Sequence, residues 1–133
     1  MKHFPKSQCD RELLRQVMLE EERPFEVTKD EVMKWFSIIN SVIFNNTLPP
    51  FHKIGIEELD EVWAWFEHFE DLNEHHLTLH HTYETKQVFI NILAHEMVHM
   101  YQQINNQPVG HGPSFRQWRH MFENNFLTLQ RKW

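Results

Sequence analysis

The feature that most constrains this chain is His95-Glu96-Met97-Val98-His99, an HExxH motif inside an apolar segment. Two histidines four residues apart lie on one face of an α-helix, about one turn from each other, so both imidazoles can reach a single Zn²⁺ ion. Zn²⁺ lowers the pKa of a water molecule to about 7, and a carboxylate beside the metal can take up the proton. The motif therefore predicts a helix that carries a zinc site, with Glu96 as a general base.

A chance match has to be considered, because the 133 residues include 11 His and 19 Asp plus Glu. The flanking residues argue against chance. Apolar side chains recur at helical spacing on both sides of the motif, which predicts a stripe buried in a core: Phe89, Ile92, Leu93, Met97, Met100 and Ile104. We expect one helix over about residues 84 to 105, with Thr82 or Thr85 near its start.

A catalytic zinc site needs a third protein ligand and keeps its fourth position open. His111 is the candidate, because the helix can end a few residues earlier and an extended chain can return from there to the metal. Gly110 and Gly112 give the backbone freedom for such a close approach. Glu123 and His120, in the segment that follows, remain alternatives.

The motif and the segment after it resemble the SprT-like metallopeptidase domain, the family of Spartan. Residues 95–101 are HEMVHMY and residues 110–115 are GHGPSF, similar to that family's HExxH helix followed by a third His in an HGxxF segment. The NNTLP segment at residues 45–49 resembles a further family pattern. The resemblance implies a zinc protease in which Glu96 is the catalytic base and the zinc ligands are His95, His99 and His111.

The resemblance also implies a fold. The implied fold is that of an α+β, zincin-like minimal metalloprotease domain, with a small antiparallel sheet packed on the HExxH helix and with flanking helices. We expect a single domain over residues 1–133, with an N-terminal leader and short helix in residues 1–27 and the family-like core in residues 28–126. An edge strand of the sheet is expected beside the helix, where a substrate peptide can add as a further strand.

Local patterns predict the other elements. Thr28 and Glu31 form a capping-box pattern before a helix that runs to about Phe44. Asp10 is expected to cap an earlier helix that ends near Glu22. Between Phe44 and the HExxH helix the apolar residues recur with a shorter period than in a helix, which predicts strands at residues 52–56, 61–67 and 77–80. Helical spacing predicts a last helix that starts at Pro113 and carries Phe115, Trp118, Phe122, Phe126 and Leu129.

Composition limits the partners and the location. The net charge of −6 argues against a broad basic face for nucleic acid, so we expect any DNA contact to be weak and local. Cys9 is the only cysteine, which rules out a disulfide within the chain and a cysteine-based zinc site. Residues 1–10 lack the apolar run of a signal peptide, and the run at residues 62–66 is too short to cross a bilayer. We expect a monomer in the cytoplasm, or in the host cytoplasm if the gene is viral, without a membrane partner.

Two other groups of residues invite interpretation. The basic side chains near the C-terminal end suit a solvated helix end, with a modest contact to DNA or to an acidic partner as the alternative: Arg116, Arg119, Arg131 and Lys132. The histidines that precede the HExxH helix suit surface positions or support of the site, and His80 or His81 is the alternative candidate to orient a ligand or to polarise a substrate carbonyl.

Two functions from different classes remain open. The first is a zinc-dependent metalloendopeptidase with a protein substrate; the resemblance to Spartan adds DNA-bound proteins, and thus repair of DNA-protein crosslinks, as an expectation. The second is a catalytically weak, zinc-stabilised module that binds another protein. A metal site kept only for structure needs no carboxylate beside the metal, so Glu96 favours the enzyme.

Overall fold

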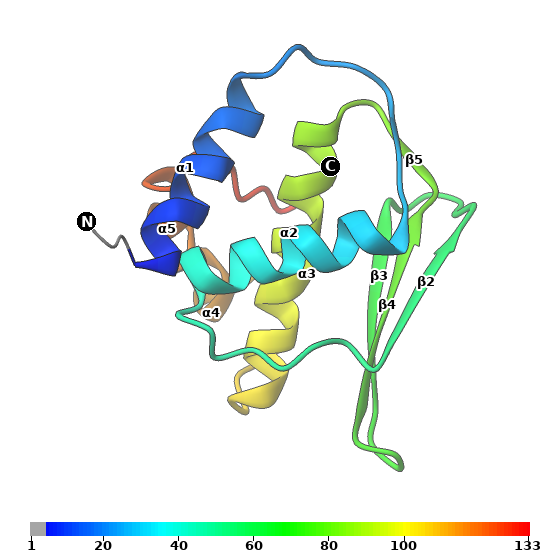
Figure 1. The fold of residues 1–133 in the computed structure, drawn as a ribbon. Coiled ribbons are helices and arrows are strands. Elements are labelled where there is room, and N and C mark those ends of the chain that lie inside the picture. The colour runs from blue at the N-terminus through cyan, green and yellow to red at the C-terminus, as the bar shows by residue number, and fades with distance from the viewer. Residues whose placement is uncertain (1–4) are drawn as a thin grey trace.

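Five helices and two small sheets make up residues 5–133, the part of the chain that the computed structural model describes (Figure 1). The helices are α1 (Lys6–Leu19), α2 (Lys29–Ile43), α3 (Lys86–Ile104), α4 (Pro113–Arg116) and α5 (Arg119–Glu123). The strands are β1 (Phe25–Glu26), β2 (Lys53–Glu57), β3 (Ala64–Phe69), β4 (Glu74–His80) and β5 (Thr82–Tyr83). Within these residues, each helix is too short or too polar to cross a membrane.

Helix α3 is the centre of the fold and confirms the predicted HExxH helix. Its N-cap is Thr85, whose side-chain oxygen accepts a hydrogen bond from the backbone N–H of Val88 at 3.1 Å. Most of its residues are buried, because α1 and α2 cover one side of it and the larger sheet lies beside another (Figure 1). The helix that carries the motif is therefore held from several directions at once.

The two N-terminal helices agree with the sequence to different degrees. Thr28 caps α2 as predicted, since its hydroxyl accepts a hydrogen bond from the N–H of Glu31 at 3.2 Å. The prediction for the first helix was wrong at both ends. Helix α1 begins at Lys6 and ends at Leu19, and Asp10 lies inside it, where its carboxylate pairs with Lys6 Nζ at 2.6 Å. The Asp10 carboxylate, which was expected to cap the helix, is thus paired with Lys6, one turn earlier in the same helix.

The larger sheet has the strand order β2-β4-β3, and it is mixed rather than antiparallel as predicted. Strand β4 pairs antiparallel with β3 in a hairpin and parallel with β2. The central place suits β4 because every second residue in it is buried, while β3 alternates between exposed and partly buried residues. Strand periodicity locates strands but not their neighbours, which is why the prediction of the pairing failed.

The prediction of one long last helix was also wrong. The chain forms the short helices α4 and α5 and then turns at Phe126, whose φ is 71°. The N–H of Leu127 bonds the carbonyl of Phe122 at 2.9 Å, and the N–H of Phe126 bonds that of Glu123 at 3.4 Å, the bonding pattern of a Schellman motif. Arg11 of α1 stabilises the turn, with its guanidinium 4.6 Å from the centre of the Phe126 ring. The residues after the turn contact α3, where the N–H of Thr128 donates to Asn91 and the carbonyl of Gln130 accepts from His95.

Candidate active site

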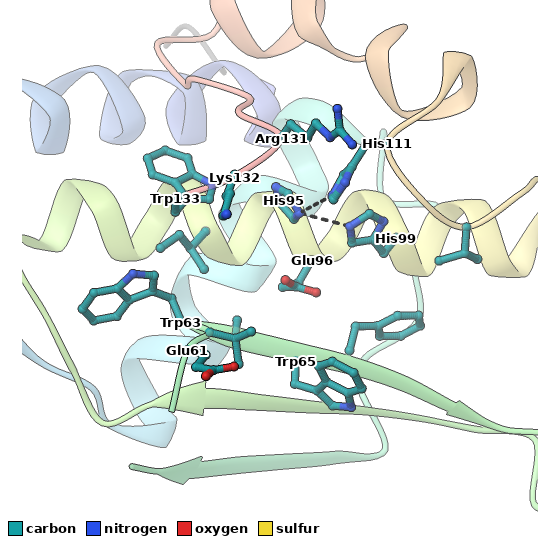
Figure 2. A pocket seen from close by; sticks show the side chains of 15 residues that line it. Glu61, Trp63, Trp65, His95, Glu96, His99, His111, Arg131, Lys132 and Trp133 are labelled. Atoms are coloured by element: carbon teal, nitrogen blue, oxygen red, sulfur yellow. Dashed lines mark hydrogen bonds between the residues drawn. The ribbon is translucent and has the colours of Figure 1, made fainter. Parts of the chain in front are cut away.

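Three histidine side chains meet at one point on α3. His95 and His99 come from adjacent turns of the helix, and His111 comes from the loop that follows it. The Nε2 atom of His95 lies 3.0 Å from Nε2 of His99 and 3.4 Å from Nε2 of His111. Figure 2 shows the three imidazoles turned toward one another, with Glu96 on the side of the sheet. The three histidines predicted as ligands are thus brought together.

The donor set fits a zinc ion. A tetrahedral Zn²⁺ with Zn–N bonds of about 2.0–2.1 Å requires ligand nitrogens about 3.3 Å apart, close to the spacing of these Nε2 atoms. Burial lowers the pKa of His95 to about 3, and burial also lowers the pKa of His99 and of His111. The imidazoles are therefore neutral at pH 7, which is the form that binds metals.

In two of these rings, Nδ1, the nitrogen that points away from the other histidines, donates a hydrogen bond to an acceptor that fixes the orientation of the ring. Nδ1 of His95 donates to the backbone carbonyl of Gln130 at 2.9 Å, and Nδ1 of His99 donates to the side-chain oxygen of Gln102 at 2.9 Å. Both acceptors are oxygens without a proton, so the proton of each ring is on Nδ1 and the lone pair is on Nε2. Such outer contacts orient metal-binding imidazoles and raise their basicity.

Glu96 occupies a buried position next to the histidines. The residue is 8% exposed, and burial raises the pKa of its carboxyl to about 8. A cation held by the three imidazoles would lower that pKa toward neutrality, where a carboxyl group exchanges protons most effectively. Position and environment are therefore those of a group that takes up and returns a proton.

A cleft of about 330 Å³ opens next to this group of residues. One wall is α3 with its histidines and Glu96, and the other is β3 with the residues just before it (Figure 2). Trp63 and Trp65 stand on that second wall and are 42% and 54% exposed. The site thus faces a groove with exposed aromatic side chains, next to the edge of a sheet.

The C-terminal segment supplies cations to the same cleft. Arg131 and Lys132 line it together with Trp133, and Figure 2 shows the Arg131 side chain beside His111. The positive charge of Arg131 contributes to the lowered pKa of His111, after burial. These two basic residues were expected on a helix end, and the early end of α5 is what allows them to reach the site instead.

Several other candidates lie elsewhere. Glu123 and His120, the alternative third ligands, are exposed on α5 and are outside the group of convergent metal-binding atoms found in residues 5–133. Neither His80 nor His81 is among the described residues that line this cleft, so its geometry gives no support to the role suggested for them. The Nδ1 atom of His80 is held by the backbone of Thr82, 2.9 Å from its carbonyl oxygen.

The comparison with known families agrees with this geometry. The family model described as the SprT-like family matches residues 32–132, about three quarters of the chain. The chain belongs to the SprT-like family. The SprT-like match extends beyond the predicted boundary at residue 126 and includes Gln130, Arg131 and Lys132, which contact or line the site. No curated protein matches the chain.

Sequence reasoning missed three contributors to this SprT-like site. Gln102 has a readable signal, because it lies three residues after His99 and hence on the same face of the helix. The carbonyl of Gln130 and the side chain of Arg131 have no such signal. Their place depends on the turn at Phe126, which the helical spacing of the apolar residues concealed.

Proposed function

We propose that this SprT-like chain is a zinc-dependent metalloendopeptidase with a zincin-like active site. The observation that carries the proposal is the convergence of three neutral imidazole Nε2 atoms beside a buried carboxyl group, at the wall of an open cleft. His95, His99 and His111 would hold the metal. When bound, Zn²⁺ supplies a Lewis acid and lowers the pKa of water to about 7.

Glu96 would move the proton in this reaction. Its carboxylate takes a proton from the attacking water and hands it to the leaving amine when the peptide bond breaks. Burial suits both steps, because a raised pKa makes the carboxyl a better base and also lets it hold a proton until the amine needs it. A metal-binding module kept for structure alone gains nothing from a buried carboxyl at this place.

The substrate would lie along β3. In residues 5–133 this strand has a partner, β4, on one side only, and its other edge is on the side of α3 (Figure 1). An extended peptide can add there as a further strand, held by its backbone and with little regard to its sequence. The exposed rings of Trp63 and Trp65 offer apolar contacts to its side chains.

Arg131 would stabilise charge that develops on the substrate. Negative charge builds up on the carbonyl oxygen when water attacks, and a cation aimed at that point lowers the barrier. The position of Arg131 in the cleft beside His111 supports this role. Lys132 lines the same cleft, and its ammonium group can hold an acidic side chain of the substrate.

The proposal is tested with wild type and Glu96→Gln, both checked for zinc content and incubated with an unfolded protein. We expect one zinc per chain in both proteins, and cleavage that falls by about 10²- to 10⁴-fold in the variant. A chelator should stop cleavage by the wild type. If zinc-loaded Glu96→Gln digests the substrate as fast as wild type does, the general base is wrongly assigned.

A second arm of the test addresses the substrate class. A basic DNA-binding protein is offered with and without single-stranded DNA, because the family resemblance points to DNA-bound proteins. Cleavage that depends on both Glu96 and DNA would support that class, and cleavage without DNA would support a general endopeptidase. Bound zinc without cleavage in either arm would favour the zinc-stabilised binding module.

A further inference from the structure

Gln102 lies where the two parts of the candidate metal site meet. It is on α3, three residues after His99, and it is 0% exposed. A fully buried amide needs partners for its oxygen and its nitrogen, because a buried polar atom without a hydrogen bond destabilises the folded state. Its contacts therefore decide how this part of the molecule is arranged.

The Gln102 side chain makes four hydrogen bonds. Its Oε1 accepts from Nδ1 of His99 at 2.9 Å and from the backbone N–H of Gly110 at 3.2 Å. Its Nε2 donates to the carbonyl of Gly110 at 3.1 Å and to Oγ of Ser114 at 2.9 Å. An amide has two acceptor and two donor positions, so its whole capacity is used.

These bonds fix the loop before and after His111. Gly110, the residue just before His111, is held by both its N–H and its carbonyl, and its φ of 156° is outside the usual range of other residues. Ser114, three residues after His111, links the two ends of the loop, because its hydroxyl donates to the carbonyl of Pro108 at 3.0 Å. The loop is thereby attached to α3 on both sides of the ligand it carries.

We propose that Gln102 is a positioning residue that couples the two parts of the metal site. One oxygen keeps the proton of His99 on Nδ1, which leaves the Nε2 lone pair free for the metal, and the same amide holds the loop that presents His111. The proposal rests on the proposed zinc site. It adds that His99 and His111 are oriented together, by one side chain, before the metal arrives.

The first test compares Gln102→Met with Gln103→Met. Methionine has nearly the volume of glutamine but cannot replace its hydrogen bonds. Gln103 is a matched control, because it is the next residue of α3 and also bonds a histidine, His75, outside the metal site. We expect zinc affinity, measured by competition with a chromophoric chelator, to fall about 10- to 100-fold in Gln102→Met and to stay near wild type in Gln103→Met.

The second readout is the tautomer of His99, measured by ¹⁵N NMR of the imidazoles in metal-free protein. Gln102→Met should lose the single Nδ1–H form that we expect for the wild type, and Gln103→Met should keep it. Equal zinc affinity in the two variants, together with an unchanged His99 tautomer, would overturn the proposal. If wild type binds no zinc at all, the proposed function fails, whereas the tautomer still reports on Gln102.

Gln102→Glu separates the effect of Gln102 on the His99 tautomer from its effect on the loop that carries His111. It also replaces Gln102→Met in the test if that variant does not fold. A carboxylate can still accept from His99 and from the N–H of Gly110, but it cannot donate to the Gly110 carbonyl. The His99 tautomer should therefore persist, while amide hydrogen exchange in residues 110–114 becomes faster and zinc affinity falls. Wild-type exchange and wild-type affinity in this variant would show that the loop does not depend on Gln102.

Discussion

Two groups of histidines lie against α3 and use their ring nitrogens differently. The metal-site histidines, His95, His99 and His111, direct their Nε2 atoms at one another. The sheet histidines, which we define as His52, His68 and His75, lie near the end of α3, and the His75 ring is 5.7 Å from that of His52 and 4.8 Å from that of His68. Ring spacing is similar in the two groups, so proximity alone does not make a metal site.

One ring nitrogen of each sheet histidine is engaged in a hydrogen bond outside the group's own rings. Nδ1 of His52 accepts the backbone N–H of His75 at 2.9 Å, and Nε2 of His68 bonds Asn73 at 3.3 Å. Nε2 of His75 is bonded to Gln103. In the metal-site group the outer nitrogens of His95 and His99 take these structural bonds, and the inner nitrogens remain free to meet. Within residues 5–133, the ring nitrogens that converge on one point are those of the metal-site group, and this convergence is the difference between the two groups.

The largest expected effect is that a substitution in the metal-site group weakens zinc binding, whereas a substitution among the sheet histidines does not. His111→Ala should lower zinc affinity by at least about 100-fold, because removal of a ligand costs more than removal of its outer support. His75→Ala should keep one zinc per chain. Elemental analysis after dialysis gives the stoichiometry, and chelator competition gives the affinity.

His120→Ala is the control for the third ligand, because His120 was an alternative and is exposed on α5. It should bind zinc as wild type does. Loss of zinc in His120→Ala with retention in His111→Ala would reverse the assignment, and loss in His75→Ala would break the distinction between the two groups.

A second difference is that the metal-site histidines open onto a cleft that contains Arg131. Arg131→Ala should slow peptide cleavage by about 10²-fold, near the lower end of the cost of removing a group that stabilises an oxyanion, while zinc content stays unchanged. The effect should appear in kcat. Arg116→Ala is the matched control, since Arg116 is exposed on α4 and away from the cleft. Equal rates for the two variants would remove Arg131 from the mechanism.

The smallest expected effect concerns acid stability. Burial lowers the pKa of His75, and the neighbouring His68, His52 and His76 lower it further, while the bond to Gln103 opposes the shift. Because the unfolded chain then takes up the proton first, the free energy of unfolding should decrease as the pH falls below the ordinary histidine pKa of about 6.5. Denaturant unfolding at pH 7.5 and 5.5, in chelator, should show a smaller decrease for His75→Phe than for wild type. An identical decrease would contradict this role of His75.

The sequence predicts the parts of the site that are encoded locally. The HExxH spacing places two imidazoles on one helix face, and the glycines around His111 indicate a close approach of the loop. The N-cap at Thr28 and the helix α3 were predicted from similar short-range sequence patterns. These features need few distant contacts, and the structure contains all of them.

The C-terminal side of the site could not be predicted in this way. Arg11, more than a hundred residues earlier in the chain, contacts the turn at Phe126, and its guanidinium also donates to the carbonyl of Asn124 at 2.8 Å. Only this turn brings the carbonyl of Gln130 to His95. Contacts between distant segments leave no periodic signal, and the pairing of β2 with β4 was missed for the same reason.

The most direct measurement is X-ray absorption spectroscopy of the protein loaded with one equivalent of zinc, in wild type and His75→Ala. The account predicts, for both proteins, three imidazole ligands at about 2.0–2.1 Å and a fourth position that the protein leaves open. His111→Ala should lose one imidazole from that spectrum. Four protein ligands, or a spectrum that changes in His75→Ala and not in His111→Ala, would contradict the assignment of the metal-site histidines to an open, catalytic zinc centre.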